Sequence, residues 1–247
     1  MPERASREEL RRDGAGAPVA AFQKCRFCGT LAVMNKADER PLAHLQIIFE
    51  EVLPALVAEN VRYWVFGGVA IAGVASRVLR SGENRNGDVD IYVCEADFNK
   101  AERIVRKLAE QHGDWDADRW VVTYSMMKGT GRPKVELYVK KYQLFSVVPV
   151  YPTEEGVEFR VITSTSLPIN ALEQEQHELE GFKFFTPPVA VLKAIFRSFI
   201  LERLETKDYI IAHGTKRRVD AESLFDSLEL EEFDERANVA LQTVGAE

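Results

Sequence analysis

The chain has 247 residues, of which 46% are hydrophobic, so it can bury the core of one large domain or of a domain with a helical appendage. Its formal net charge of -7 argues against a protein coated with nucleic-acid contacts, because nonspecific binding to phosphates depends on a positive field. No apolar run is long enough to cross a bilayer, and the start of the chain lacks the hydrophobic region of a signal peptide. We therefore expect a cytoplasmic protein without a membrane partner.

Residues 1–33 mix Arg, Glu, Gly, Ala and Pro without periodicity, which predicts a weakly ordered N-terminal arm. The arm contains Cys25 and Cys28 in a Cys-x-x-Cys pair, half of the ligand set of a tetrahedral zinc site. Because no second cysteine pair follows, we interpret the pair as decoration of the arm. The three cysteines of the chain, without an export signal, predict reduced thiols.

The next segments predict a helix, a strand and a second helix in that order. Apolar residues recur at helical spacing over 41–58, and a short apolar and β-branched run follows at 61–66. This run stops at Gly67 and Gly68, after which helical spacing resumes over 69–78. Glycines at a strand-to-helix turn let backbone N–H groups approach phosphate oxygens at the start of the helix.

An acidic strand is predicted after the loop-like residues 81–87. From Asp88 to Cys94 acidic and apolar residues alternate at first, in the order Asp-Val-Asp-Ile-Tyr-Val-Cys, which is typical of a strand. Side chains two positions apart on a strand point to the same face, so Asp88 and Asp90 lie together. They are either the solvated face of a half-buried strand or two ligands for Mg²⁺, which prefers oxygen.

Further along the chain, the pattern predicts a helix and then several strands. The helix covers about 97–111, and strands follow at 120–126, 135–139, 145–150 and 157–162. The glycine-containing residues 128–133 predict that the first two strands form a hairpin. Glu136 stands in the second of these strands, in the stretch Lys-Val-Glu-Leu-Tyr-Val. We expect it to supply a third carboxylate, with the alternative that it decorates a solvated edge strand.

The last third of the chain is predicted to be helical. Helical patterns cover 167–171, about 188–204 and about 221–228, and the acidic stretch from Glu173 to Glu180 indicates a solvated helix or loop. We therefore expect a core over 34–165 and a helical C-terminal region over 166–247. Lys193 lies among apolar residues of its helix, which favours a ligand role, with snorkelling to solvent as the alternative.

The stretch Val-Phe-Gly-Gly-Val-Ala-Ile, followed by Asp88-Val89-Asp90-Ile91, resembles the signature of the polymerase-β superfamily of nucleotidyltransferases. The resemblance extends over about 41–230 and implies an α/β (α+β) fold with a small mixed sheet and a helical C-terminal region. Small lincosamide and aminoglycoside nucleotidyltransferases and abortive-infection-type toxins are similar in particular. Two departures are a long spacer over 69–87 and Val219 at a position where the toxins tend to have Lys.

The resemblance also implies roles for individual residues. With the resemblance, we expect three carboxylates to bind Mg²⁺ and to act in catalysis: Asp88, Asp90 and Glu136. We expect the glycine turn and cations to bind the nucleotide: Gly67, Gly68, Arg77, Arg85 and Lys193. The alternatives are close helix packing for the glycines and ordinary loop charges for the two arginines. The basic stretch from Lys216 to Arg218, with Asp220 after it, resembles a basic-plus-Asp helix of the toxin group.

Three functions compete at this stage. The first is transfer of a nucleoside monophosphate from an NTP, expected to be ATP, to the hydroxyl of a small molecule, which the acidic composition favours. The second is transfer to tRNA or protein, with the cleft lined by basic residues such as Arg217 and Arg218. The third is a nucleotide-binding module without catalysis. The intact Asp-x-Asp argues against it, because two buried like charges without a metal are unfavourable.

Overall fold

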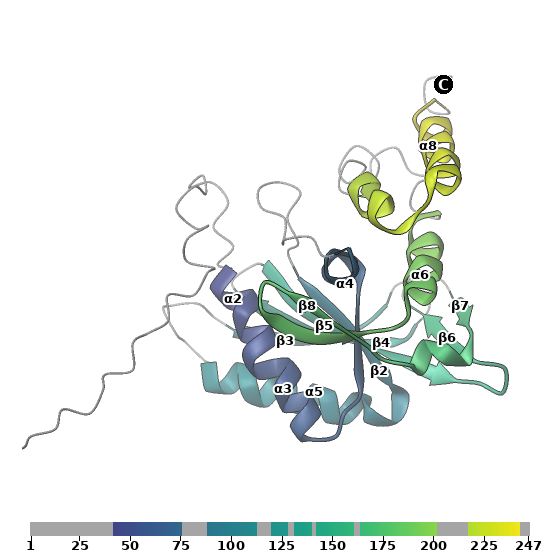
Figure 1. The fold of residues 1–247 in the computed structure, drawn as a ribbon. Coiled ribbons are helices and arrows are strands. Elements are labelled where there is room, and N and C mark those ends of the chain that lie inside the picture. Colours follow the sequence, from purple (N-terminus) through teal and green to yellow (C-terminus); the bar gives the residue numbers. More distant parts are fainter. Residues whose placement is uncertain are drawn as a thin grey trace, which may run out of the picture. The chain divides into compact units, whose positions relative to one another are not determined.

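The computed structural model describes residues 42–75, 88–112, 120–127, 131–139, 142–160, 164–201 and 217–242 (Figure 1). The expected arm over 1–33, with its two cysteines, lies outside these residues, and so do Arg77 and Arg85. Within the described segments, no helix is long and apolar enough to cross a membrane.

The described strands form one mixed sheet and one separate hairpin. In the sheet the order is β1-β2-β5-β4-β3, with β6 beside β5 and β7 beside β6. The bounds are β1 Tyr63–Phe66, β2 Val89–Cys94, β3 Trp120–Met126, β4 Pro133–Val139, β5 Tyr142–Pro152, β6 Val157–Arg160 and β7 Ser164–Leu167. Strands β2 and β5 run parallel, and the other recorded pairs in the sheet are antiparallel. The predicted strands and the β3–β4 hairpin are therefore confirmed, and β7 is an addition to them.

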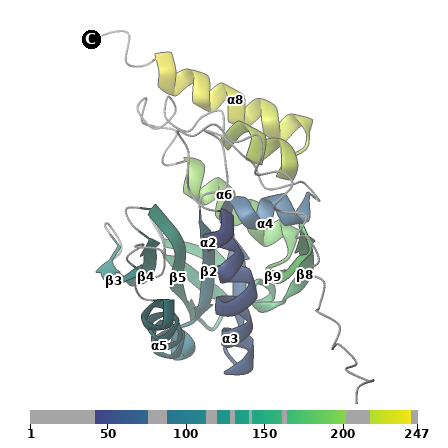
Figure 2. The same cartoon turned by 90° about the vertical axis from the view of Figure 1, so that its left-hand side faces the viewer.

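The helices pack on both sides of these strands. Their bounds are α2 Leu42–Ile47, η2 Ile48–Val52, α3 Leu53–Ala58, α4 Gly67–Val74, α5 Glu95–His112, η5 Ile169–Leu172, α6 Val189–Leu201 and α8 Ser227–Gln242, with residues 217–224 also helical. Helix α5 packs against β2, β3, β4 and β5. In Figure 1, α3 and α5 lie together below the strands, and in Figures 1 and 2 α4 and α6 lie together above them.

Alternation along β2 decides which side chains enter the core. Val89, Ile91 and Val93 are fully buried, and α5 covers strands β2 to β5 with an apolar stripe. The stripe is made of Phe98, Ala101, Val105 and Ala109. Because successive strand residues point to opposite faces, Asp88 and Asp90 belong to the other face of the sheet.

One prediction for the C-terminal region is wrong. The stretch from Glu173 to Glu180 was expected to be a solvated helix or loop, but it contains strand β8 Glu175–Leu179, which pairs with β9 Phe182–Thr186. The turn is formed by Glu180 and Gly181, both with positive φ, a backbone typical of two-residue hairpin turns. The hairpin is stable because its inner side chain Phe184 is 1% exposed and packs against Phe49.

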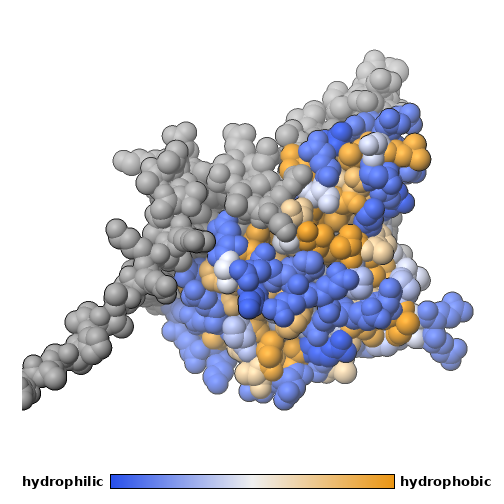
Figure 3. Space-filling view, in the orientation of Figure 1, coloured by the Kyte–Doolittle hydropathy of each residue, from blue (hydrophilic) through white to orange (hydrophobic). Residues whose placement is uncertain are grey.

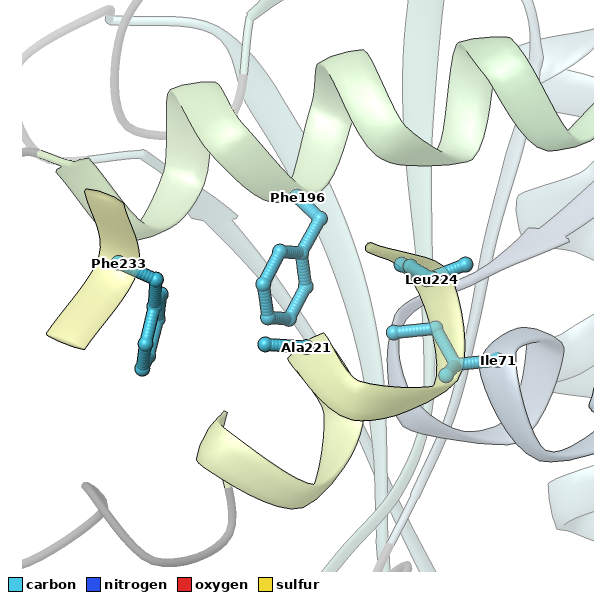
Figure 4. Packing of buried hydrophobic residues seen from close by; sticks show 5 residues of the cluster. All are labelled: Ile71, Phe196, Ala221, Leu224 and Phe233. Atoms are coloured by element: carbon cyan, nitrogen blue, oxygen red, sulfur yellow. The ribbon is translucent and has the colours of Figure 1, made fainter. Parts of the chain in front are cut away.

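The C-terminal helices share an apolar cluster with α4. Figure 4 shows Phe196 of α6 and Phe233 of α8 facing Ala221 and Leu224 of the helical segment 217–224, with Ile71 of α4 beside them. In Figure 3, hydrophobic residues gather over α6, between the hydrophilic hairpin and α8. The cluster therefore ties residues 217–224 to the helix that begins at the glycine pair.

Candidate functional site

The two aspartates of the Asp-x-Asp stretch bond to the same neighbouring strand. Asp88 immediately precedes β2 and accepts a hydrogen bond from Gln143 Nε2 at 3.2 Å on Oδ2. Asp90, within β2, accepts a hydrogen bond from the Ser146 hydroxyl on Oδ1. Both acids are half-buried. The structure thus brings Asp88 and Asp90 to one face, where β5 holds each of them.

Glu136 lies in the same row of the sheet, one strand further away. Asp90 is the register partner of Ser146, and Ser146 is the partner of Glu136. Neighbouring strands are about 4.8 Å apart, so the backbones of Asp90 and Glu136 are separated by about 10 Å. Ser146 is 1% exposed and fills the position between them. Sequence reasoning missed it, because a serine in an apolar strand carries no signal of its own.

The carboxylate of Glu136 is already engaged. Its Oε1 lies 2.7 Å from Lys134 Nζ, and its Oε2 accepts a long hydrogen bond of 3.5 Å from the Ser125 hydroxyl. In the segments that the structure describes, no three Asp, Glu, His or Cys side chains gather as a metal-ligating group. Glu136 therefore does not form one compact cluster with Asp88 and Asp90, and its metal role stays a prediction.

The glycine turn adjoins the acids. Gly67 is the first residue of α4, and its φ of +74° lies in the left-handed region that favours glycine. A Cβ atom at this position would meet Asp90 Oδ2 at 3.2 Å. Gly68 follows as the second residue of the helix. The start of α4, where N–H groups are unpaired, thus lies directly beside a carboxylate.

The site carries excess negative charge. Burial, and after it the negative charge of Asp88, raise the pKa of the Asp90 carboxyl to about 7. The Ser146 hydrogen bond and the charges of Lys134 and Arg217 act in the opposite direction. Protein atoms surround Asp90 on most sides although part of its surface stays exposed. Two carboxylates that the protein leaves incompletely neutralised fit a divalent cation, which binds oxygen ligands.

The helical segment 217–224 brings a cation to the acids. Arg217 is close enough to lower the pKa of Asp90, and its guanidinium pairs with Asp220 at 3.5 Å. Asp220 is 1% exposed and precedes Ala221 of the apolar cluster, so the pair fixes Arg217 from a buried position. Sequence reasoning named Arg217 only as part of a basic stretch. Its place beside Asp90 follows from packing against α4, which no local pattern reveals.

Lys193 lies in α6, where it faces the last helix. Its Nζ is 3.1 Å from Glu229 Oε2 of α8, and Arg197 pairs with the other oxygen of Glu229 at 2.8 Å. The backbone N–H of Asp226 lowers the pKa of Glu229, and Lys193 lowers it further. The predicted contact of Lys193 with a nucleotide stays a prediction, because its recorded partner is Glu229.

No family model matches the sequence, and no curated protein matches it. Solved structures do match. The crystal structure of ANT(2″)-Ia in complex with adenylyl-2″-tobramycin superimposes with a TM-score of 0.52 at 17% identity, covering 83% of this chain and 99% of that chain. The solution structure of the same antibiotic-resistance factor gives a TM-score of 0.50 at 15% identity, covering 83% and 92%. The chain is similar to both in fold, which confirms the predicted α/β class with a mixed sheet and a helical C-terminal region.

Proposed function

We propose that this protein, which has the nucleotidyltransferase fold, transfers a nucleoside monophosphate from an NTP to a hydroxyl group of an acceptor. One observation carries the proposal: Gly67, at the start of α4, lies against Asp90 Oδ2. A helix start binds phosphate and paired carboxylates bind a divalent cation. Both requirements of nucleotidyl transfer therefore meet at one point of the chain.

Asp88 and Asp90 would hold Mg²⁺, because they are the two carboxylates on one face whose charge the protein leaves incompletely neutralised. When bound, Mg²⁺ neutralises charge on the triphosphate and lowers the pKa of the acceptor hydroxyl. The glycine turn supplies backbone N–H groups to the phosphates. Arg217, whose charge lowers the pKa of Asp90, adds a cation, and Arg77, Arg85 and Lys193 remain further proposed ligands.

The residues of β4 fit the acceptor side of the reaction. The acceptor oxygen forms a bond to the α-phosphorus, and the bond from that phosphorus to pyrophosphate breaks. The hydroxyl proton goes to Glu136 Oε2, the oxygen that accepts the long 3.5 Å hydrogen bond from Ser125. Lys134 pairs with the other oxygen, Oε1, at 2.7 Å and holds the carboxylate in place.

A small-molecule acceptor is favoured over RNA or protein. Of the cations expected to line an RNA cleft, the two that lie within the described residues are paired with acids: Arg217 with Asp220, and Arg218 with both Glu222 and Asp234. Such pairs leave little positive field for a phosphate backbone. The fold neighbour ANT(2″)-Ia was solved with adenylyl-2″-tobramycin, which is a nucleotide joined to a small molecule.

The test uses the full chain with Mg²⁺ and each of four α-labelled NTPs, incubated with pooled small-molecule extracts and separately with tRNA. We expect label to pass to a small molecule with release of pyrophosphate. Asp90→Asn should reduce transfer by about 10³-fold, because several kcal/mol of charge stabilisation are lost. Asp97→Asn on α5 is the matched control and should transfer normally. Undiminished transfer by Asp90→Asn would contradict the role of Asp90 in the reaction. Label on tRNA alone would contradict the small-molecule acceptor.

A further inference from the structure

Strand β5 gives one neutral hydrogen-bond donor to each aspartate of the proposed cation site. Gln143 Nε2 donates to Asp88 Oδ2 at 3.2 Å, and the Ser146 hydroxyl donates to Asp90 Oδ1. One oxygen of each carboxylate is thereby occupied. The other oxygen of Asp90, Oδ2, is the one that lies toward Gly67.

A bulge in β5 is what puts both donors on the same face. In a regular strand, residues three apart point to opposite faces, so Gln143 and Ser146 would not share one. The register shifts between Leu137 and Tyr138, whose partners on β5 are Phe145 and Gln143, and Leu144 is left between them. An extra residue in one strand re-aims the side chains that follow it.

The bulged residue lies in the core. Leu144 and Phe145 are 1% and 0% exposed, so the extra residue and its neighbour are both buried. Gln143 therefore emerges on the acidic face, where its side chain is half-buried. A glutamine in this position can satisfy its amide with water, so its bond to Asp88 is not forced by burial alone.

We propose that Gln143 and Ser146 are positioning residues for the cation site: they orient Asp88 and Asp90 and leave Asp88 Oδ1 and Asp90 Oδ2 available for a divalent cation. The inference rests on the proposed function, since it needs a cation at these acids. Residues that hydrogen-bond to metal ligands fix the orientation of those ligands, and their loss weakens metal binding. Because the donors are neutral, they orient the carboxylates without cancelling their charge.

The experiment measures Mn²⁺ binding to the full chain by electron paramagnetic resonance, with Mn²⁺ alone and no nucleotide. Gln143→Met keeps the shape of the side chain without the donor, and Ser146→Ala removes the hydroxyl. We expect each to weaken Mn²⁺ binding by roughly 10- to 100-fold. Ser146→Thr restores the hydroxyl and should bind like the wild type.

Two control variants remove an amide and a hydroxyl at positions away from the two aspartates. Gln46→Leu removes an amide donor to the carboxylate of Glu50 on an exposed helix face, and Ser166→Ala removes an exposed hydroxyl on β7. Both should bind Mn²⁺ like the wild type. Thermal melting identifies any variant that fails to fold, and the pair Ser146→Ala and Ser146→Thr then decides alone.

The outcomes separate this inference from the proposed function. Wild-type binding of Mn²⁺ that is unchanged in Gln143→Met and Ser146→Ala would overturn the positioning role and leave the cation site standing. Absence of Mn²⁺ binding by the wild type would overturn the cation site and this inference together. Weaker binding in both variants with rescue by Ser146→Thr supports the inference.

Discussion

The acidic face of the sheet and the C-terminal helices both contain charged side chains that we assign to the proposed nucleotide site, but they hold them in different ways. On the sheet, Asp88 and Asp90 bond to neutral partners, Gln143 and Ser146. In the helices, cations bond to acids, as Lys193 does to Glu229. The aspartates of the sheet thus lack a cationic hydrogen-bond donor in these contacts, whereas the cation Lys193 of the helical region is paired with an acid.

The difference indicates two ways to prepare a site. The hydrogen bonds between paired strands fix the positions of side chains in register. The proposed cation ligands are therefore in place before a cation binds. Long cationic side chains in ion pairs must exchange an acidic partner for a phosphate, which costs little where the pair is partly exposed. We therefore expect the sheet to dominate metal binding and catalysis, and the helices to modulate nucleotide affinity.

The largest expected effect concerns the unbalanced charge of the sheet. The pKa of Asp90 rises from its ordinary value of 3.8 to about 7 in the folded chain without metal. Between these values the folded chain keeps a proton that the unfolded chain releases, so stability falls as the pH rises from 4 to 7 and then levels off. Melting without metal should show this decline as several degrees. Asp90→Asn should flatten it.

Mg²⁺ sharpens the same measurement. At pH 8 the ionised aspartates bind the cation, so added Mg²⁺ should raise the melting temperature, whereas at pH 5 Asp90 is protonated and the rise should be small. An equal rise in melting temperature at both pH values would contradict this prediction. It would indicate that Mg²⁺ binds at a site other than Asp88 and Asp90.

The next effect concerns the turn that joins the strand to α4. Gly67→Ala puts a side chain on a left-handed residue, which costs about 1–2 kcal/mol, and crowds Asp90 Oδ2 at 3.2 Å. Gly131→Ala is the matched control, since Gly131 has a φ of +63° but nothing within 4 Å of the added atom. Denaturant unfolding should show similar losses for both. Nucleotide affinity, measured by calorimetry, should fall only in Gly67→Ala.

The smallest effect is expected in the helices. Lys193→Met and Glu229→Gln each break a partly exposed pair and should change the free energy of unfolding by under about 1 kcal/mol. If Lys193 binds phosphate, its variant should raise the KM for NTP while Glu229→Gln does not. Arg197→Met, which removes the other partner of Glu229, controls for loss of the pair. Equal KM values for all three would confine Lys193 to a structural role.

Local patterns were enough to predict much of the sheet. Periodicity predicts features that depend on neighbours in sequence. These are the alternation around Asp88 and Asp90, the apolar run that ends at Gly67, and the β3–β4 hairpin. The placement of Gln143 depends on a bulge, and that bulge follows from packing of Leu144 in the core. No pattern in single residues encodes such a shift.

The helical region was less predictable for a related reason. The partner of Lys193 is a glutamate on a different helix, and Arg217 reaches Asp90 only because Leu224 and its neighbours pack on α4. The hairpin β8–β9 was missed because β8, Glu-Gln-His-Glu-Leu, is mostly polar and exposed, so it lacks the alternation of apolar and polar residues that predicts a strand. Glu180-Gly181 was the turn signal that the sequence offered.

The parallel pairing of β2 with β5 dictates when the site can form during folding. Strands β3, β4 and β5 are joined in sequence and can pair as soon as they are made, whereas β2 must wait until α5, β3 and β4 have all been laid down. The aspartates can therefore meet Gln143 and Ser146 only after β5 has been synthesised. A growing chain that ends before β5 contains both aspartates but lacks Gln143 and Ser146, the donors that orient them.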